Sequence, residues 1–172
     1  GTTRFSAPQN ITLEHHHIKQ HSYIDYKQLF SIRRNYSVTE KADGERNLCI
    51  ILNNGEVFLL NRKNEIKPLG CSIPGLENSI LDGELILKDK HNKNIILFAV
   101  FDIYFHNNTD VRGRVFNRTN EEKIEDRLDK SRDEILTDIF KKIELVFNKN
   151  TTLYFIKKQF YYGNQEKYVR EQ

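Results

Sequence analysis

The sequence LCIILNNGEVFLL, residues 48–60, sets Asn53-Asn54-Gly55 between two apolar runs. An Asn-Gly pair in this position is the strongest short-range signal for a β-hairpin. The stretch therefore predicts two antiparallel strands, over residues 48–52 and 57–60, joined by a tight turn.

Further strands are predicted on both sides of this hairpin, over residues 36–41, 80–87, 95–105 and 153–162. Residues 95–105 are almost wholly apolar, which indicates a strand at the centre of the sheet. Between the hairpin and the strand at 80–87, the chain is expected to break at Pro68, Pro74 and Gly75.

Helices are predicted to cover this sheet. Thr119 and Glu122 have the spacing of a capping box, in which each side chain accepts a hydrogen bond from the other residue's backbone N–H. Apolar residues then repeat at helical spacing, at Ile124, Leu128, Ile135, Ile139, Ile143 and Val146. This pattern predicts one long amphipathic helix, with shorter helices over residues 26–34 and from 165 onward. The expected fold class is α+β, with a mainly antiparallel sheet.

The composition is that of a globular protein with a buried core, since 38% of its 172 residues are hydrophobic and 30% are charged. The net charge of +3 permits a nucleic-acid or nucleotide partner without demanding one. Cys49 and Cys71 are too few for a disulfide framework and lack metal-site spacing, so an intracellular location is expected. No apolar run approaches the roughly 18 residues that span a bilayer, so no membrane partner is expected.

Residues 1–22 form a polar N-terminal segment, with histidines at 15, 16, 17 and 21. Adjacent histidines point in different directions and no Cys or acidic residue completes a metal shell, so a solvated stretch is expected. Residues 23–172 are expected to belong to one domain. Because the chain starts at Gly1, contains no Met and ends abruptly at Gln172, we expect a fragment of a longer polypeptide.

The candidate chemistry lies in residues 39–46, TEKADGER. One tight turn here brings together the amine of Lys41, the carboxylate of Asp43 and the guanidinium of Arg46. A lysine with a lowered pKa is a nucleophile, and a guanidinium offers planar donors for phosphate or ribose oxygens. Gly44 lets the backbone approach a ligand or adopt a positive φ. Taken alone, these residues are better explained as a charged Asp-Gly hairpin turn.

Two later stretches of the sequence favour a reactive site over a plain hairpin turn. Residues 81–85, LDGEL, add a second acidic turn between apolar runs, and residues 98–104, FAVFDIY, set a carboxylate in an apolar strand. Glu84 and Phe101 each have a plain structural explanation, as a solvated strand residue and as core. Asp102 is harder to explain, because a carboxylate among apolar neighbours needs a partner.

The order and spacing of these elements resemble the covalent nucleotidyltransferase superfamily, which contains mRNA capping guanylyltransferases and ATP- or NAD-dependent polynucleotide ligases. Residues 41–46, KADGER, fit its Lys-x-Asp-Gly-x-Arg motif at every fixed position. Asp82-Gly83-Glu84 and Phe101-Asp102 follow in the expected order. Three matches in register over residues 36–105 are a strong signal, and they imply the ATP-grasp-like fold of ligases and capping enzymes.

Within the superfamily the resemblance favours the capping branch. Residues 58–65, FLLNRKNE, look like the segment of capping enzymes in which a hydrophobic strand runs into Asp-Arg-x-Asn, with Asn61 in place of the Asp. Many ligases read adenine with a Glu two residues before the nucleophile, where this chain has Thr39. Residues 101–105 and 110–112 resemble capping enzymes of large nucleocytoplasmic DNA viruses, which would place the protein in the virion or the host cytoplasm.

The resemblance implies that Lys41 attacks the α-phosphate of GTP and forms a lysyl-GMP intermediate, from which GMP passes to a 5′-diphosphate RNA. Mg²⁺ or Mn²⁺ would neutralise the triphosphate, and Asp43 would orient the lysine, with a proton-transfer role left open. Asp102 is implied either as an indirect metal-binding residue or as a structural residue of the sheet. The implied nucleotide-binding residues are Thr39, Glu40, Arg46, Arg62, Glu84 and Phe101.

Arg46 and Glu84 would hold the ribose, Arg62 would face the phosphates or ribose, and Phe101 would stack on the base. The superfamily also needs a later Glu-Gly or Asp-Gly strand, a Lys-x-Lys strand and usually an OB-fold, and none of these occurs before Gln172. Adjacent Lys157 and Lys158 point to opposite faces of a strand and substitute poorly for Lys-x-Lys. The domain is therefore expected to be truncated before its C-terminal part, with weak or absent activity alone.

Three alternatives stay open. An adenylation domain of an ATP-dependent DNA or RNA ligase shares the lysine chemistry and differs in the nucleotide. A binding module that kept the fold without the chemistry would act through a capped RNA, or through other capping domains or subunits. A generic α+β domain with chance turns would leave the three motifs far apart in space.

Overall fold

The computed structural model describes residues 7–8, 12, 14, 36–117, 129–147 and 153–161. The chain divides into two compact units. One contains Ala42–Lys158 together with Gly1–Phe5, and the other contains Ser6–Lys41 together with Gln159–Gln172. The first unit holds every strand and the helix described below.

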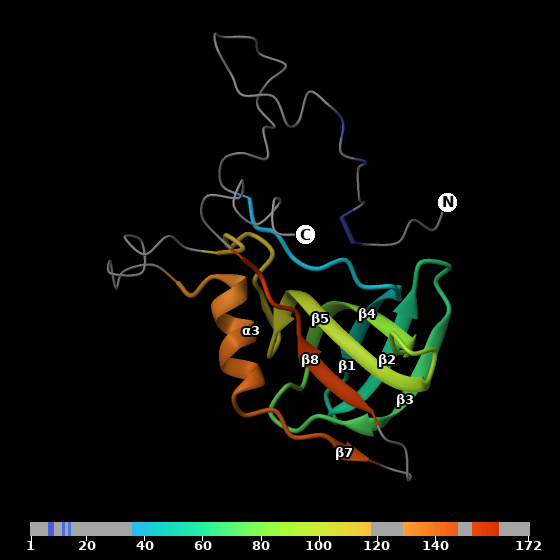
Figure 1. The fold of residues 1–172 in the computed structure, drawn as a ribbon. Coiled ribbons are helices and arrows are strands. Elements are labelled where there is room, and N and C mark those ends of the chain that lie inside the picture. The colour runs from blue at the N-terminus through green and yellow to red at the C-terminus, as the bar shows by residue number, and fades with distance from the viewer. Residues whose placement is uncertain are drawn as a thin grey trace, which may run out of the picture. The chain divides into compact units, whose positions relative to one another are not determined.

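The first unit is built on one eight-stranded sheet with the order β6-β5-β4-β1-β2-β3-β7, and β8 pairs with β5 (Figure 1). The sheet curves into a half-barrel and is antiparallel except at β5 and β8, which run parallel. The predicted mainly antiparallel sheet is therefore confirmed. Residues 95–105 form an interior strand with partners on both sides, second in the order and not at the centre. The strands are β1 (Glu45–Ile51), β2 (Glu56–Asn61), β3 (Ile66–Ser72), β4 (Ser79–Lys88), β5 (Asn94–His106), β6 (Thr109–Asp110), β7 (Val146–Phe147) and β8 (Tyr154–Lys157).

The predicted hairpin is confirmed as β1 and β2, with Leu48 opposite Leu60 and Ile51 opposite Val57. Gly55 adopts a φ of 82°, which glycine reaches without strain. Its backbone N–H donates to the carbonyl oxygen of Leu52 at 3.0 Å, which closes the turn.

The predicted break at Pro68 is wrong, because Pro68 lies within β3 opposite Phe58 of β2. Among the described strands, the other side of β3 is paired only at Cys71 and Ser72, with β7. A proline costs no ladder hydrogen bond on an unpaired side, so the edge position of β3 accommodates it.

The prediction of one long helix is also wrong. The helix of this region, α3 (Arg132–Phe140), begins after the N-cap Ser131, and Val146 belongs to β7. Ser131 and Glu134 form the capping box of α3, with the Glu134 carboxylate accepting from the Ser131 N–H at 2.9 Å. The predicted cap at 119–122 and the predicted helices at 26–34 and 165–172 lie outside the described residues. None of the helices within the described ranges is long and apolar enough to span a membrane.

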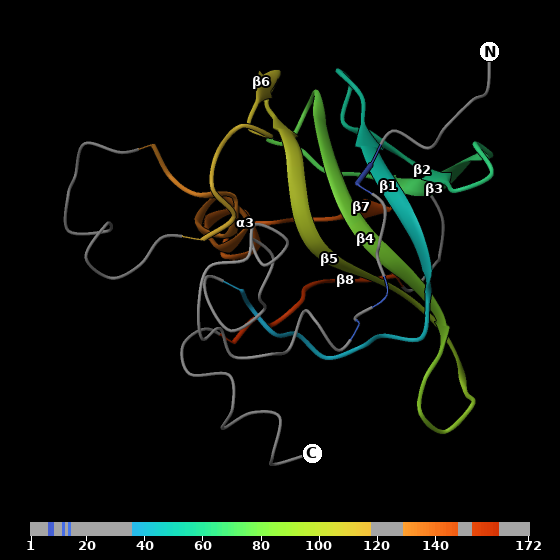
Figure 2. The same cartoon turned by 90° about the horizontal axis from the view of Figure 1, so that it is seen from above.

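The hydrophobic core lies between the sheet and α3, which covers β5 and β8 (Figure 2). Leu136 of α3 is fully buried together with Phe98 and Ile103 of β5. The Phe155 ring of β8 lies 5.3 Å from that of Phe98 and 5.9 Å from that of Phe140 between centroids, so aromatic packing joins β8 to β5 and to α3. The two cysteines are unpaired and buried, at Cys49 and Cys71.

In the second unit, the strand predicted over residues 36–41 is reduced to an isolated bridge between Val38 and Tyr161. The two residues exchange backbone hydrogen bonds of 3.0 and 2.8 Å. Thr39 Oγ1 donates to the carbonyl oxygen of Gln159 at 2.7 Å. The strand predicted over 153–162 is correspondingly shorter, since β8 ends at Lys157.

Gly83 of β4 is enclosed by β5. A Cβ at this position would lie 2.7 Å from Cζ of Phe98 and 2.8 Å from the carbonyl oxygen of Ala99. Because Phe98 is fully buried and cannot swing away, Gly83→Ala should lower the free energy of unfolding by roughly 1–3 kcal/mol. Urea unfolding measures this change, and Gly113→Ala is the matched control because nothing lies within 4 Å of its added Cβ. Equal stability of the two variants would contradict the prediction.

Candidate active site

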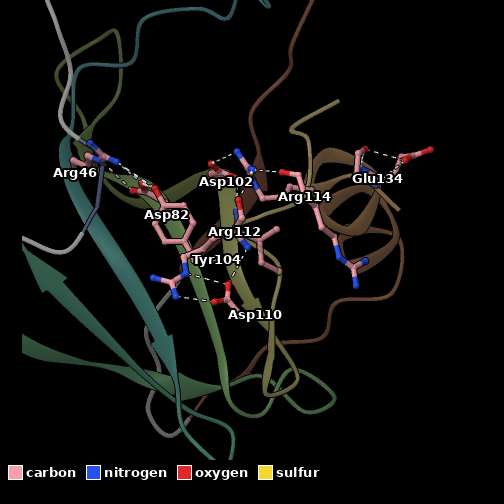
Figure 3. Close-up of polar contacts among 11 residues, drawn as sticks. Arg46, Asp82, Asp102, Tyr104, Asp110, Arg112, Arg114 and Glu134 are labelled. Carbon is pink, nitrogen blue, oxygen red and sulfur yellow. Dashed lines mark hydrogen bonds and ion pairs between the residues drawn. The ribbon is translucent and has the colours of Figure 1, made fainter. Parts of the chain in front are cut away.

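A buried polar triad joins the first, fourth and fifth strands. Arg46 of β1 donates through Nε to Asp82 Oδ1 at 3.0 Å and through Nη2 to Asp82 Oδ2 at 2.5 Å. The hydroxyl of Tyr104 on β5 donates to the same Oδ2 at 2.5 Å (Figure 3). Asp82 is fully buried and the side chain of Arg46 is 7% exposed. The bidentate pairing therefore fixes the guanidinium plane in one orientation.

Burial and charge shift the pKa values of Arg46 and Tyr104. The hydrogen bond to Asp82 raises the pKa of Arg46 above its usual range, despite the opposing effect of burial. Burial also raises the pKa of Tyr104, and Asp82 adds to the rise. Both groups therefore keep their protons at neutral pH, so Arg46 carries a permanent positive charge into the site.

Phe101 of β5 lies beside two cations. The guanidinium carbon of Arg46 is 5.6 Å from the Phe101 ring centroid, and Nζ of Lys158 is 5.9 Å from it. Lys158 Nζ also lies 3.6 Å from Glu84 Oε2. Arg46, Asp82, Glu84, Phe101 and Lys158 thus form one group, the site cluster, contributed by strands far apart in the sequence.

Glu84 occupies the middle of the site cluster, since β4 places it opposite Arg46 of β1 and Ala99 of β5. Its Oε2 is buried and accepts no hydrogen bond within the part of the chain that the structure describes. A buried carboxylate oxygen with unfilled acceptor capacity is suited to a hydroxyl donor from a ligand.

Lys158 is a site residue that the sequence reasoning missed. The expectation that Lys157 and Lys158 point to opposite faces is confirmed, because Lys157 Nζ lies 2.7 Å from Asp133 Oδ1 of α3 while Lys158 reaches Glu84. Because Lys157 and Lys158 fit a Lys-x-Lys strand poorly, the sequence did not indicate that Lys158 belongs to the site. The parallel pairing of β8 with β5 carries Lys158 to Phe101, and no local sequence pattern reveals such a pairing.

Asp102 of β5 has the partner that its apolar setting requires. Arg132 of α3 donates to it through Nε at 2.8 Å and through Nη2 at 3.2 Å. Burial raises the pKa of Asp102, although Arg132 acts in the opposite direction. This engagement suits a structural ion pair better than direct metal ligation, and the metal role of Asp102 stays a prediction. No group of three metal-binding side chains occurs among the residues that the structure covers.

The turn of residues 41–46 spans both units. Lys41 and Glu40 are exposed and belong to the second unit, as does Thr39, whereas Asp43 is exposed in the first. Of the two roles expected for Gly44, the positive φ does not occur, and the close approach of the backbone to a ligand stays a prediction. A Cβ on Gly44 would lie 2.9 Å from the carbonyl oxygen of Leu85 and from Cγ1 of Ile86, and its absence lets the chain approach β4.

The family model of the mRNA capping enzyme, catalytic domain, matches residues 3–170. The chain belongs to this family. It is also 36% identical over 108 residues to the probable mRNA-capping enzyme of Acanthamoeba polyphaga mimivirus. That match covers 55% of this chain and 9% of the relative, so the chain spans a small part of the length of that protein.

Membership in the capping-enzyme family makes the departure at Asn61 informative. Asn61 Oδ1 accepts from the N–H groups of Lys63 at 2.9 Å and Glu65 at 3.0 Å, as an aspartate would. Its Nδ2 donates to the carboxylates of Glu65 at 2.8 Å and Glu45 at 3.3 Å, where an aspartate would repel both. Asn61 therefore suits this turn, which holds exposed Arg62. No hydrogen bond or ion pair joins Arg62 to the site cluster within the described ranges.

The segment 110–112, which resembles viral capping enzymes, forms an exposed ion pair. Arg112 donates through Nε to Asp110 at 3.0 Å, and its guanidinium lies 5.1 Å from the Phe105 ring centroid. The hydrogen bonds from Arg112 lower the pKa of Asp110 to about 2.

A separate groove of about 600 Å³ lies against α3 and contains none of the predicted site residues. Ile73, Leu76 and Ile139 belong to its apolar lining, and Arg114 and Lys142 to its charged lining. The chemistry of the capping-enzyme family is therefore to be sought at the site cluster.

Proposed function

We propose that this chain carries the nucleophilic lysine of an mRNA capping guanylyltransferase with the fold of the covalent nucleotidyltransferases. The observation that carries the proposal is the meeting of Arg46, Glu84 and Phe101 in one cluster. These three residues come from three separate motifs of the superfamily, and chance turns would leave them scattered. The KADGER motif and the family match support the same reaction.

In the proposed reaction, Nζ of Lys41 attacks the α-phosphorus of GTP. The new P–N bond forms as the bond to the bridging oxygen breaks, and pyrophosphate leaves while the amine loses a proton. An oxygen of the terminal phosphate of a 5′-diphosphate RNA then attacks the same phosphorus. The P–N bond breaks, and the lysine amine departs and regains a proton. A divalent cation such as Mg²⁺ or Mn²⁺, when bound, neutralises the charge of the triphosphate and pyrophosphate.

The site cluster would hold the nucleoside. A base stacked on Phe101 would lie beside Lys158. Oε2 of Glu84, which has Lys158 at 3.6 Å but accepts no hydrogen bond among the described residues, would accept one from a ribose hydroxyl. Arg46, held rigidly by Asp82, would contribute charge without reorganising. Arg62, Thr39, Glu40 and Asp43 belong to the proposed site on the family motif alone.

Lys158 also bears on the choice between GTP and ATP. An ammonium group donates hydrogen bonds and accepts none, so it complements O6 of guanine and opposes the amino group of adenine. Lys158→Met should therefore lower the ratio of GTP to ATP labelling by tenfold or more, the value of about one charge-assisted hydrogen bond. Lys142→Met, at an exposed lysine outside the cluster, should leave the ratio unchanged. An unchanged ratio in Lys158→Met would count against this role.

The test of the proposed function is covalent labelling of the full-length protein with α-labelled GTP or ATP and Mg²⁺ or Mn²⁺. We expect acid-labile, alkali-stable label from GTP, mapped by peptide mass spectrometry to Lys41, and little label on the 172-residue chain alone. Label from ATP alone would move the protein to the ligases. No label from either nucleotide would leave the fold without the chemistry.

A further inference from the structure

The first turn of α3 is tied to the sheet by two ion pairs that lie outside the site cluster. Arg132 pairs with Asp102 of β5, with Nε 2.8 Å from Oδ1. The next residue, Asp133, pairs with Lys157 of β8, with Oδ1 2.7 Å from Nζ. All four side chains are no more than 21% exposed, so solvent screens these pairs less than surface pairs.

Each sheet partner in these pairs is the sequence neighbour of a cluster residue. Asp102 follows Phe101 on β5, and Lys157 precedes Lys158 at the end of β8. Lys157 and Lys158 point to opposite faces, toward α3 and toward the cluster respectively. On β5 the pairing with β4 shifts register at Phe101, so Asp102 lies directly opposite Asp82 while its side chain is held by Arg132. One helical turn thus grips the two strands at the points that present Phe101 and Lys158.

The β5–β8 seam needs such support. β8 has only four residues, and its pairing with β5 is parallel, the slightly weaker arrangement. Beyond the strand, a hydrogen bond of 2.7 Å from the Lys158 N–H to the Val100 carbonyl oxygen continues the pairing. A slip or tilt of β8 would move Lys158 relative to Phe101 directly.

Arg132 itself is immobilised by several contacts. Besides Asp102 it donates to the carbonyl oxygens of Arg112 and Arg114, and its guanidinium lies 5.6 Å from the Phe116 ring centroid. The capping box at Ser131 fixes the start of the same turn. The turn is therefore a rigid reference point for both strands.

We propose that Arg132 and Asp133 are positioning residues, which set the spacing of Phe101 and Lys158 across the β5–β8 seam and so control which purine base the site accepts. This inference rests on the proposed function. It assigns base selectivity in part to the first turn of α3, which lies outside the site cluster.

A double-mutant cycle on the full-length protein tests the inference, with the ratio of GTP to ATP labelling as the readout. Lys157→Met should lower the ratio roughly fivefold, within the range of coupling between contacting residues. Asp133→Asn removes the same ion pair from the helix side and should lower the ratio in the same direction. In the Lys158→Met background, neither substitution should lower the ratio further, because both act through Lys158.

The matched control is Asp138→Asn on the same helix. It removes exposed ion pairs with Lys130 at 2.7 Å and Lys141 at 3.2 Å and should leave the ratio unchanged. A merely structural role would lower the melting temperature and the labelling by both nucleotides without changing their ratio. The inference would be overturned if Lys157→Met and Asp133→Asn left the ratio unchanged, or if their effects added to that of Lys158→Met. Either outcome would leave the proposed function standing. Absence of label in the wild-type protein would overturn the proposed function and this inference together.

Discussion

Lys41→Arg is expected to reduce covalent labelling by GTP by roughly 10⁴-fold or more, as is usual when an enzyme loses its nucleophile. Arginine keeps the positive charge of the lysine, so electrostatic attraction of the triphosphate is preserved. Its guanidinium stays protonated, and therefore it has no lone pair with which to attack phosphorus. The measurement is the rate of label incorporation under single-turnover conditions, with GTP binding followed separately by fluorescence of a labelled analogue.

The comparison of binding with labelling makes the Lys41 result specific. We expect GTP binding by Lys41→Arg to remain within a few-fold of the wild-type value, because the loss is confined to the chemical step. Lys63→Ala, at an exposed lysine in the turn after β2, is the control and should label normally. Substantial label in Lys41→Arg would place the nucleophile on another residue.

Asp82→Ala is expected to lower the free energy of unfolding by about 3–5 kcal/mol, because it breaks a buried ion pair in which the carboxylate accepts two hydrogen bonds from Arg46. The Tyr104 hydroxyl loses its acceptor at the same time. Chemical denaturation at neutral pH measures the loss, and the midpoint should fall at an unchanged denaturant slope if unfolding remains two-state.

Two comparison variants separate burial from charge pairing as such. Tyr104→Phe removes the hydrogen bond that the hydroxyl donates to Asp82 and the longer one, 3.5 Å, that it accepts from Arg46. The ion pair stays intact, so the substitution should cost about 1–2 kcal/mol. Asp110→Ala breaks another bidentate Asp–Arg pair, but that pair is exposed and its loss should have little measurable effect. If Asp82→Ala proved no more harmful than Asp110→Ala, the triad would not be the buried, tightly coupled unit described above.

The hairpin and the longest strand were predictable because their signals are local. Asn53-Asn54-Gly55 specifies a turn by its own backbone preferences, and residues 95–105 are apolar enough to indicate a buried interior strand. The sequence predicts that the Asp102 carboxylate requires a partner, but it does not identify which residue that partner is. Arg132 lies on a helix 30 residues further along the chain.

The elements that the sequence reasoning missed depend on context. Pro68 predicts a break in the strand unless it is known that one side of β3 is largely unpaired. The apolar spacing of residues 124–146 continues past both ends of α3, so periodicity alone hides the cap at Ser131. Tyr104 reaches Asp82 through the pairing of β4 with β5, and Lys158 reaches the cluster through the pairing of β5 with the distant β8, and neither register is written in the local sequence. The motif at residues 41–46 could be recognised from the sequence, whereas the arrangement of the site cluster could not.

The parallel pairing of β8 has a consequence for the order in which the protein folds. The antiparallel neighbours β1 and β2 are joined by a short turn, whereas Leu97 and Tyr154 pair across 57 positions of the chain (154 − 97). Contacts between distant positions carry a larger loop-closure entropy and form more slowly. We therefore expect the hairpins to assemble early and β8 to dock late, together with α3. On a ribosome, the earlier strands would emerge and pair before Lys158 exists to join them.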